Sequence, residues 1–248
     1  MNAYQETVFD EIASRYDAVW SDTAVGKAQR SAVWSRIDPL FKKGDLVLDL
    51  GCGTGVDALH LQSRGVLMYG IDSSLRMVEL ARQRGIQADC CQIEHLQYFD
   101  LCLDGVISNF GALNCLSSLE PIANSLGRMV RPGGHLALCF LSSVCLWEIT
   151  FYLARGNPRK AFRRLGGRAT SSMGMDVFYP SGTEVVSALH SSFRLLDVYG
   201  IGICVPPSYV TFLSNRHVER LSALDQRLAH KPILRSLADH RLYIFKRI

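Results

Sequence analysis

Short apolar runs alternate with amphipathic stretches over the first 141 residues of this 248-residue chain. Runs of consecutive apolar residues are typical of buried strands, whereas apolar residues that recur every three or four positions are typical of helices. The runs predict strands over residues 46–50, 66–71, 86–90, 105–109 and 135–141. The helical pattern predicts a first helix through Val8, Ile12, Tyr16 and Val19, and others over residues 25–40, 56–64, 75–84 and 119–130. This alternation predicts an α/β fold with a parallel sheet and helices on both faces.

The pattern changes after residue 142. Two helices and a strand are predicted next, over residues 143–154, 158–165 and 175–179. They form an insertion after the fifth strand of the sheet. A helix and two strands complete the chain, over residues 181–190, 193–205 and 241–247. We expect these final two strands to pair in antiparallel fashion at an edge of the sheet.

A glycine-rich loop directly after the first predicted strand is the most informative segment. Gly51, Gly53 and Gly55 stand at alternate positions in the sequence VLDLGCGTG. Glycine allows a positive φ and leaves room for a ligand beside the backbone, so such a loop between a strand and a helix forms a nucleotide-type pocket. The dinucleotide pattern needs a glycine where this chain has Val56, and Asp49 at the strand end would repel a pyrophosphate. A cofactor with a positive centre and no phosphate, such as S-adenosylmethionine, suits the loop better.

With this loop, the chain resembles the class I S-adenosylmethionine-dependent methyltransferases over roughly residues 4–141. The matching motifs follow in the family's order: FDEIASRYD at 9–17, LDLGCGTG at 48–55, IDSS at 71–74, DGVISN at 104–109 and RPGG at 131–134. The first motif is similar to the first helix of small-molecule members, including the quinone C-methyltransferases. The resemblance is specific for the cofactor and says little about the methyl acceptor.

The resemblance implies a Rossmann-like sheet of seven strands, mostly parallel, with helices on both faces and an antiparallel last strand. It also implies that residues 1–248 form a single methyltransferase domain. Within that domain we expect an N-terminal helical lid, a cofactor-binding core, a helical insertion that covers the substrate, and C-terminal strands and helices, over residues 1–44, 45–141, 142–180 and 181–248 respectively.

Asp72 is the strongest single cofactor candidate. It follows the second predicted strand, and its carboxylate can accept hydrogen bonds from both ribose hydroxyls, which are stronger because the acceptor is charged. The alternative role is capping of the next helix. By resemblance, Asp89 accepts the adenine amino group, unless it is a loop aspartate facing water. Met77 packs on the adenine face, unless it belongs only to the core.

Two residues before the glycine loop are expected at the methionine end of the cofactor. Tyr16 resembles the family's tyrosine that closes over this end. Arg30 is a candidate partner of the cofactor carboxylate, because a guanidinium fork matches a carboxylate, although a solvated helix arginine is the commoner outcome. The complete predicted cofactor set is Tyr16, Arg30, Asp49, Gly51, Cys52, Gly53, Gly55, Asp72, Ser73, Met77, Asp89, Cys90 and Asn109.

Composition and charge limit the function further. The chain is 48% hydrophobic and 20% charged, as globular proteins are, and its eight cysteines form no C-x-x-C pair. We therefore expect reduced thiols, a cytoplasmic protein and no metal. The N-terminus carries no secretory pattern, and the most apolar run, residues 136–146, is too short to span a bilayer. Basic residues concentrate within residues 154–168, so a nucleic-acid partner is not indicated.

The insertion is the best clue to the methyl acceptor. Residues 146–153 are apolar and aromatic, and the next segment places four basic residues at helical spacing on one face: Arg159, Lys160, Arg163 and Arg164. Three interpretations compete. This face is solvated on a lid, or the lid covers an apolar or aromatic acceptor that bears an anionic group, or residues 146–168 touch anionic lipid at a membrane surface.

Methyl transfer is an in-line displacement that depends on aligning the reactants and excluding water. A general base is needed only where the acceptor must lose a proton. The candidates are Asn114, Glu148, Tyr179 and Tyr209, none of which has a companion at diagnostic spacing. His95, His135 and His190 are predicted to be structural.

Together these features predict an S-adenosylmethionine-dependent methyltransferase that acts on a small molecule, in the cytoplasm or peripherally at a membrane. We expect O- or C-methylation of an aromatic or lipid-like precursor. The alternatives are N-methylation of a small molecule and a non-catalytic, cofactor-binding partner protein.

Overall fold

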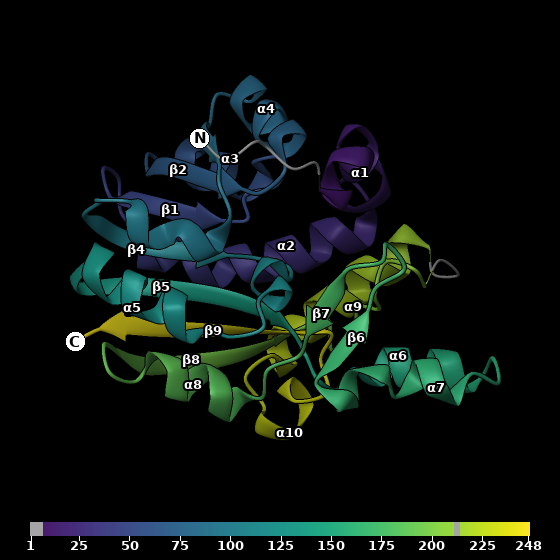
Figure 1. Ribbon diagram of the computed structural model, residues 1–248. Coiled ribbons are helices and arrows are strands. Elements are labelled where there is room, and N and C mark those ends of the chain that lie inside the picture. Colours follow the sequence, from purple (N-terminus) through teal and green to yellow (C-terminus); the bar gives the residue numbers. More distant parts are fainter. Residues whose placement is uncertain (1–6, 211–213) are drawn as a thin grey trace.

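The computed structural model describes residues 7–210 and 214–248, and a seven-stranded sheet forms its centre (Figure 1). The strand order is β3-β2-β1-β4-β5-β9-β8. Neighbouring strands are parallel except around β9, which is antiparallel to both β5 and β8. The strands are β1 Leu46–Leu50, β2 Leu67–Asp72, β3 Gln87–Cys90, β4 Leu103–Ser108, β5 Val130–Leu141, β8 Phe193–Ile201 and β9 His240–Arg247. The predicted fold with its reversed last strand is confirmed.

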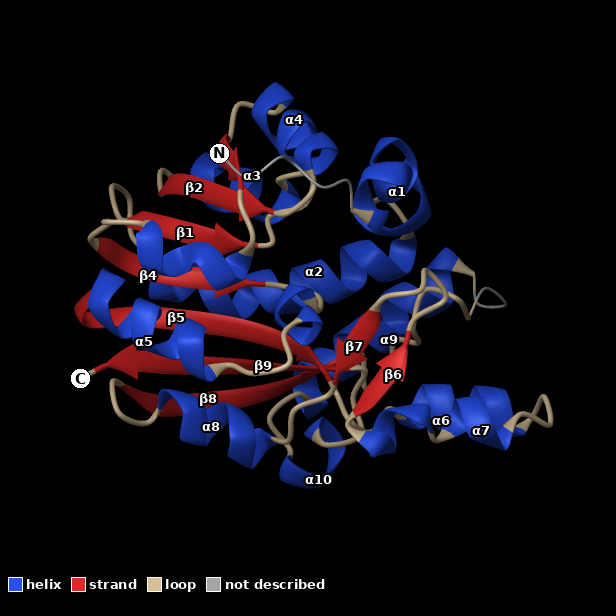
Figure 2. Cartoon of the chain, viewed as in Figure 1, coloured by secondary structure: helices blue, strands red, loops and turns tan. Residues whose placement is uncertain are grey.

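Helices cover both faces of this sheet (Figure 2). They are α1 Val8–Tyr16, α2 Ala24–Ile37, α3 Val56–Ser63, α4 Leu75–Gln83, α5 Glu120–Met129, α8 Gly182–Leu189, α9 Asn215–Leu228 and α10 Pro232–Arg235. Shorter helical turns are η1 Asp17–Ser21, η2 Asp38–Leu40, η3 Ile93–Tyr98 and η4 Ala112–Cys115. Residues of α5 and α8 belong to one hydrophobic core, and residues of α2, α3 and α4 belong to the other.

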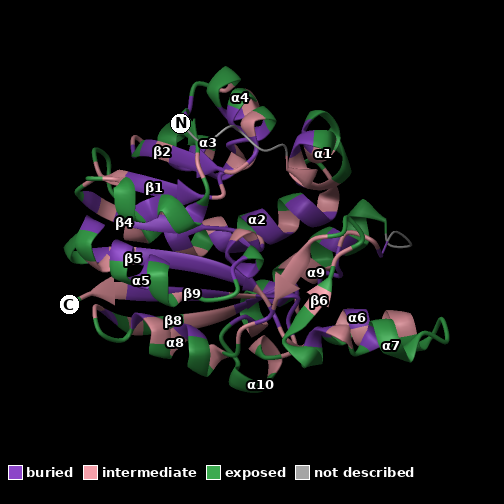
Figure 3. Cartoon of the chain, in the orientation of Figure 1, coloured by how far each residue is buried: buried purple, intermediate pink, exposed green. Residues whose placement is uncertain are grey.

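The side chains of β1 alternate between these two cores. Leu48 and Leu50 pack with α5 and α8, whereas Val47 packs with α2 and α3. Because both faces of the strand are covered, its residues are apolar on either side, as is usual in parallel sheets. Figure 3 shows the result, with buried strands in the centre and exposed residues along the outer surfaces of the helices.

The insertion after β5 differs from its prediction. It contains α6 Leu146–Leu153, α7 Pro158–Ala161, the turn η5 Arg163–Gly166 and a hairpin of β6 Arg168–Thr170 and β7 Asp176–Phe178. The helix expected over residues 158–165 is wrong, since α7 is a single turn followed by a 3-10 turn. The strand expected near residues 175–179 exists, but it pairs only with β6 and not with the main sheet.

Several segments gather at one edge of the main sheet, on the right in Figure 1. The carboxyl ends of β1, β2, β4 and β5 lie there, together with α1, the β6–β7 hairpin and α6. The first residue of the reversed strand, His240, pairs with Leu141 at the end of β5 and so lies at the same edge. Residues 1–6 of the predicted N-terminal lid lie outside the described residues. Within those residues, no helix has the length and apolar character needed to cross a bilayer.

Candidate functional site: a glycine loop and an adjoining cavity

The three glycines of the loop after β1 all adopt a positive φ, between 53° and 80°. A Cβ at Gly51 would stand 2.3 Å from the Cβ of Ala112, and one at Gly55 would stand 3.0 Å from the Cβ of Ala81. Both positions therefore need glycine for packing as well as for conformation. A Cβ at Gly53 would meet no protein atom within 4 Å, so the middle glycine is the one that a ligand can approach.

Asp72, the last residue of β2, holds this loop in place. One carboxylate oxygen accepts a hydrogen bond from the Gly53 amide at 2.8 Å, and the other accepts one from the Ser74 amide at 2.9 Å. Burial raises the pKa of this carboxyl, and the backbone N–H groups offset part of the shift. The N-cap of the next helix is Ser74, whose hydroxyl accepts from the Met77 amide, so Asp72 does not take the capping role and instead lies on the wall of the cavity described next.

A cavity of about 740 Å³ opens at the carboxyl edge of the sheet, within the range of small-molecule sites. Nine predicted site residues line it: Tyr16, Gly51, Gly53, Asp72, Ser73, Met77, Asn109, Tyr179 and Tyr209. Four that do not line it, Arg30, Asp49, Cys52 and Gly55, lie in or near the glycine loop, at or beneath its backbone. Burial raises the pKa of Tyr16 to about 12, so this phenol stays protonated at neutral pH.

Asp89 and Cys90 at the end of β3 do not line the cavity. The carboxylate of Asp89 is exposed, accepts a hydrogen bond from the Tyr69 hydroxyl and pairs with Arg82 at 2.8 Å. The adenine contact of Asp89 stays a prediction, and reaching the cavity would require these two bonds to rearrange. Cys90 is exposed, with its thiol 3.5 Å from the carbonyl of Ser73.

Arg30 is buried, so the expectation of a solvated helix arginine is wrong. Its guanidinium pairs with Asp57 of α3 and lies 4.4 Å from the ring centre of Trp20 and 5.2 Å from that of Phe110. The Nε–H of Arg30 has no hydrogen-bond partner among the described residues. Arg30 therefore stands behind the aromatic wall of the cavity with one donor unused.

Unpaired polar groups beneath the loop fit a cationic, hydrogen-bonding cofactor. Both amide atoms of Asn109 and one oxygen of Asp49 are buried with no protein partner among the described residues. Burial and the neighbouring carboxylates of Asp57 and Asp72 raise the pKa of Asp49 well above its usual value, while Arg30 opposes them. S-adenosylmethionine carries a sulfonium and an ammonium group, so it can supply the positive charge that these carboxylates lack. When bound, it supplies an activated methyl group.

The loop after β4 lines the same cavity as the glycine loop. Phe110 has a φ of 54°. Among the described residues other than glycine, it is the one with a positive φ. Non-glycine residues adopt such a backbone at a cost, and they cluster at functional sites. The Phe110 ring packs against Trp20, with centres 4.8 Å apart, and against His240 at 5.4 Å. Sequence analysis missed all three of these residues, which line the cavity together.

The predicted basic face of the insertion is wrong for two of its four residues. Arg163 and Arg164 turn inward and line the cavity, and both donate hydrogen bonds to the carboxylate of Glu148, which is 1% exposed. Arg164 also pairs with Asp239 at 2.9 Å. Burial opposes the charge on Glu148, yet the two guanidinium groups lower its pKa below the usual 4.5. Such a carboxylate is a weak proton acceptor at neutral pH.

The other catalytic candidates have different surroundings. Tyr209 donates its hydroxyl to Glu148 at 2.9 Å, and Tyr179 is buried with its ring 5.6 Å from the Arg164 guanidinium. Asn114 is fully buried away from the cavity, where it donates to the carbonyl of Phe178 at 2.6 Å and accepts from the Leu141 amide at 2.8 Å. Its hydrogen bonds tie β7 to the end of β5.

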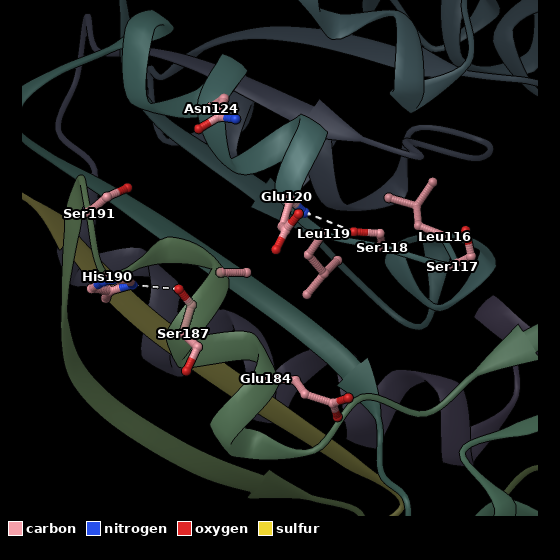
Figure 4. A pocket seen from close by; sticks show the side chains of 11 residues that line it. Leu116, Ser117, Ser118, Leu119, Glu120, Asn124, Glu184, Ser187, His190 and Ser191 are labelled. Atoms are coloured by element: carbon pink, nitrogen blue, oxygen red, sulfur yellow. Dashed lines mark hydrogen bonds between the residues drawn. The ribbon is translucent and has the colours of Figure 1, made fainter.

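A second depression, of about 470 Å³, lies between the start of α5 and α8 (Figure 4). Its lining is mostly serine and acidic side chains, and His190 there makes a local hydrogen bond with the carbonyl of Ser187. It shares only Leu116 with the glycine-loop cavity among its lining residues. The glycine-loop cavity is therefore the site that combines buried charges, unpaired polar groups and strained backbone.

Comparison with known proteins agrees with this geometry. The family model described as "Methyltransferase domain" matches residues 47–134. The chain is 31% identical over 160 residues to the demethylmenaquinone methyltransferase of Corynebacterium kroppenstedtii. The matched region covers 62% of this chain and 69% of that protein. It is 31% identical over 165 residues to the enzyme of the same name from Mycobacterium marinum, covering 62% and 68%.

A solved structure extends the likeness to the whole fold. It is the complex between the Haloferax volcanii Trm112 methyltransferase activator and the putative methyltransferase, with a TM-score of 0.65 at 16% identity over 98% of this chain and 99% of that chain. The glycine loop, the motif order and these relatives together show that the chain belongs to the class I S-adenosylmethionine-dependent methyltransferases, and that it is an enzyme of the small-molecule type.

Proposed function

We propose that this enzyme methylates oxygen or carbon of an electron-rich aromatic or lipid-like acceptor. The observation that carries this proposal is the composition of the cavity wall beyond Phe110. That wall is apolar or aromatic at Met173, Met175 and Val177 of the hairpin segment and at Tyr179 and Tyr209. Apolar pockets with a few placed polar groups bind ligands of the same character.

The charges of the insertion support a neutral acceptor over an anionic one. Arg163 and Arg164 are matched by the carboxylates of Glu148 and Asp239, so the cluster carries no net charge when all four are ionised. A permanently anionic group would have to compete with these carboxylates, and breaking a buried ion pair is costly. A phenol or quinol, neutral until its proton leaves, avoids this competition.

The two relatives described above act, by their names, on a demethylated menaquinone. A reduced naphthoquinone is aromatic, lipid-like and uncharged. It therefore suits a wall of apolar and aromatic side chains beside a charge cluster with no net charge. We therefore take a 1,4-naphthoquinol with a short prenyl chain as the first acceptor to test.

The test uses purified protein, S-adenosylmethionine and this quinol, kept reduced under anaerobic conditions. We expect the quinol to gain one methyl group by mass spectrometry. Replacement of Asp72 by alanine should weaken binding of S-adenosylhomocysteine by about 1.5–3 kcal/mol in titration calorimetry, because charged hydrogen bonds are lost. Cofactor binding without methyl transfer to the quinol or to simple naphthols would contradict the proposed acceptor class. Unchanged affinity of Asp72→Ala would contradict the cofactor site.

We also propose that the outer surface of α6, α7 and η5 touches anionic membrane lipid. Leu153, Phe162 and Leu165 are 44–57% exposed there, and exposed Arg159 and Lys160 lie in the same segment. Apolar residues flanked by basic ones are suited to an anionic interface. This proposal no longer involves Arg163 and Arg164, which point inward.

Vesicles of phosphatidylglycerol and phosphatidylcholine provide the test. The double variant Arg159→Gln/Lys160→Gln should sediment less with these vesicles than the wild type, while retaining its activity on a water-soluble naphthol. Arg168→Gln is the control, because Arg168 is exposed but already paired with Asp176. Equal sedimentation of all three proteins would contradict the lipid contact and would mean that this face is only solvated.

A further inference from the structure

Building on the proposed function, we propose that His240 is the general base that takes the proton from the methyl acceptor, and that Asp239 orients its ring. His240 is the first residue of the reversed strand β9 and lines the cavity. Among the described residues it is the histidine on the cavity wall. Its ring contacts Phe110, which in turn borders the glycine loop side of the cavity.

The hydrogen bonding of His240 leaves the ring free to accept a proton. Its Nδ1 is buried and lies 3.4 Å from a carboxylate oxygen of Asp239, without an aligned hydrogen bond. A small rotation of the ring would let Nδ1–H donate to Asp239. That tautomer leaves Nε2, on the opposite side of the ring, as the basic nitrogen. By contrast, Nδ1 of His190 in the second depression already has a partner in its own helix (Figure 4).

Burial favours the neutral imidazole of His240 before the reaction, and the carboxylate of Asp239 stabilises the imidazolium that forms afterwards. Burial lowers its pKa below the ordinary 6.5, Asp239 raises it, and Arg164 lowers it. The facing groups are thus the carboxylate of Asp239, which directly precedes β9, one guanidinium from η5 and the uncharged ring of Phe110. Burial raises the pKa of Asp239, but a protonated His240 and Arg164 together lower it by more, so this carboxylate is ionised when the imidazolium forms. An imidazolium formed at His240 would have this carboxylate as its partner.

The proposed step balances with the chemistry of the acceptor. The acceptor O–H bond breaks and its proton moves to Nε2 of His240. The electron pair that is released drives formation of the new bond to the methyl carbon, from oxygen directly or from the ring carbon conjugated with it. The methyl–sulfur bond breaks with its pair remaining on sulfur, which becomes a neutral thioether. In the carbon case, the ring C–H proton then passes to a water molecule, and the electron pair of that bond restores the aromatic ring with its oxygen as a phenolate. The imidazolium of His240 returns the O–H proton to this oxygen.

The first experiment compares wild type, His240→Gln and His190→Gln on the prenylated naphthoquinol. Loss of a general base is expected to lower kcat at least 100-fold in His240→Gln. Its affinity for S-adenosylhomocysteine should stay within twofold of the wild type, and His190→Gln should behave as wild type. A His240→Gln enzyme that is folded, binds S-adenosylhomocysteine and retains its kcat would overturn the proposal.

Asp239→Asn tests the positioning role through the pH profile. Because Asp239 raises the pKa of His240, its removal should move the acid limb of kcat to lower pH. A merely structural role would lower activity without moving that limb. Circular dichroism of each variant confirms that it is folded before its profile is interpreted.

A second readout needs no acceptor. Diethyl pyrocarbonate modifies neutral, reachable imidazoles, and peptide mass spectrometry identifies the labelled histidine. The labelling rate of His240 in the complex with S-adenosylhomocysteine should fall as the pH is lowered, with the midpoint of the decrease below pH 6.5, as its lowered pKa requires. If the quinol is not methylated, the acceptor class fails while this labelling still supports the base. Absence of labelling at His240 in the folded protein would overturn the base itself.

Discussion

At the scale of single residues, surroundings decide which carboxylates are charged. Asp49 is buried with one oxygen unpaired, and its pKa is raised well above 3.8 by burial and neighbouring carboxylates. Glu148 and Asp239 are buried as well, but guanidinium partners lower their pKa values. An ionised Asp49 lowers the stability of the protein until a cation binds beside it. The ionised Glu148 and Asp239 contribute stability because their partners are already in place. The presence or absence of protein partners, and not the degree of burial, therefore distinguishes a carboxylate of the ligand site from a structural one.

Replacement of Asp49 by asparagine should stabilise the cofactor-free protein at neutral pH. The raised pKa of Asp49 means that its contribution to stability is present below the unfolded value of 3.8 and is lost as pH rises toward the folded value. Removing the charge should therefore raise Tm at pH 7 by about 2–10 °C, from about 1–3 kcal/mol of relieved burial. Thermal melts at pH 7 and near pH 3.5 check this. A gain of equal size at both pH values would contradict the electrostatic origin.

At the scale of elements, hydrogen bonds fasten the N-terminal helices to the cofactor loops. Asp10 of α1 accepts from the Ser74 hydroxyl at 2.7 Å and from the Arg76 amide at 3.0 Å, at the start of α4. Asp17 accepts from the Thr54 hydroxyl at 2.8 Å in the glycine loop. The residues that resemble the family's first helix therefore act partly through these two aspartates, which hold Tyr16 over the cavity.

Gly53 of the glycine loop and Gly133 of β5 offer a matched pair of variants. Gly53 and Gly133 both have a positive φ, and a Cβ at either would meet no protein atom within 4 Å. Alanine at either position should therefore lower the free energy of unfolding by about 1–2 kcal/mol, because the backbone becomes strained. Only Gly53→Ala should also lower affinity for S-adenosylhomocysteine, at least tenfold, because its Cβ enters the space that a ligand needs. Equal affinities of the two variants in calorimetry would contradict the placement of the cofactor.

At the scale of the whole molecule, one buried arginine joins the insertion to the sheet. Arg164 of η5 donates to Glu148 of α6, to Asp239 beside β9 and to the carbonyl of Ser142 after β5. Tyr209, from the segment after β8, reaches the same carboxylate of Glu148. The insertion is therefore joined to the sheet by a charge network whose members Arg164, Tyr209 and Asp239 themselves line the cavity.

Replacement of Arg164 by glutamine should lower the free energy of unfolding by about 3–5 kcal/mol at pH 7, because buried Asp239 loses its guanidinium partner and buried Glu148 keeps only Arg163 and Tyr209. Since Glu148 and Asp239 have lowered pKa values, their contribution is lost as pH falls below about 4, so the variant and the wild type should converge there. Urea unfolding measures both. Arg168→Gln, which removes an exposed pair with Asp176, should change little. A comparable loss in both variants would argue against a special role for the buried network.

The cofactor half of the site was largely predictable because it is built from consecutive strand–loop–helix units. Each unit places its loop at the same edge of the sheet, so Gly51, Gly53 and Asp72 could be assigned from their positions after β1 and β2. Asp89 has the correct position after β3 but lies outside the cavity, because Tyr69 and Arg82 hold it. For Asp89, the sequence pattern identifies the loop after the strand, but tertiary packing decides where the side chain points.

The sequence by itself determined the alternation of strands and helices, the glycine loop and the cofactor that suits it, because these depend on residues close together in the chain. Tertiary structure alone decided the part of the cavity where we propose that the acceptor binds, which is lined from five distant segments by Trp20, Phe110, Arg164, Tyr209 and His240. His240 belongs there only because β9 runs in reverse, which brings its first residue to the edge where the parallel strands end. The sequence predicts the reversal itself but places the strand over residues 241–247, and only the register of β9 with β5 shows that His240 pairs with Leu141 at this edge.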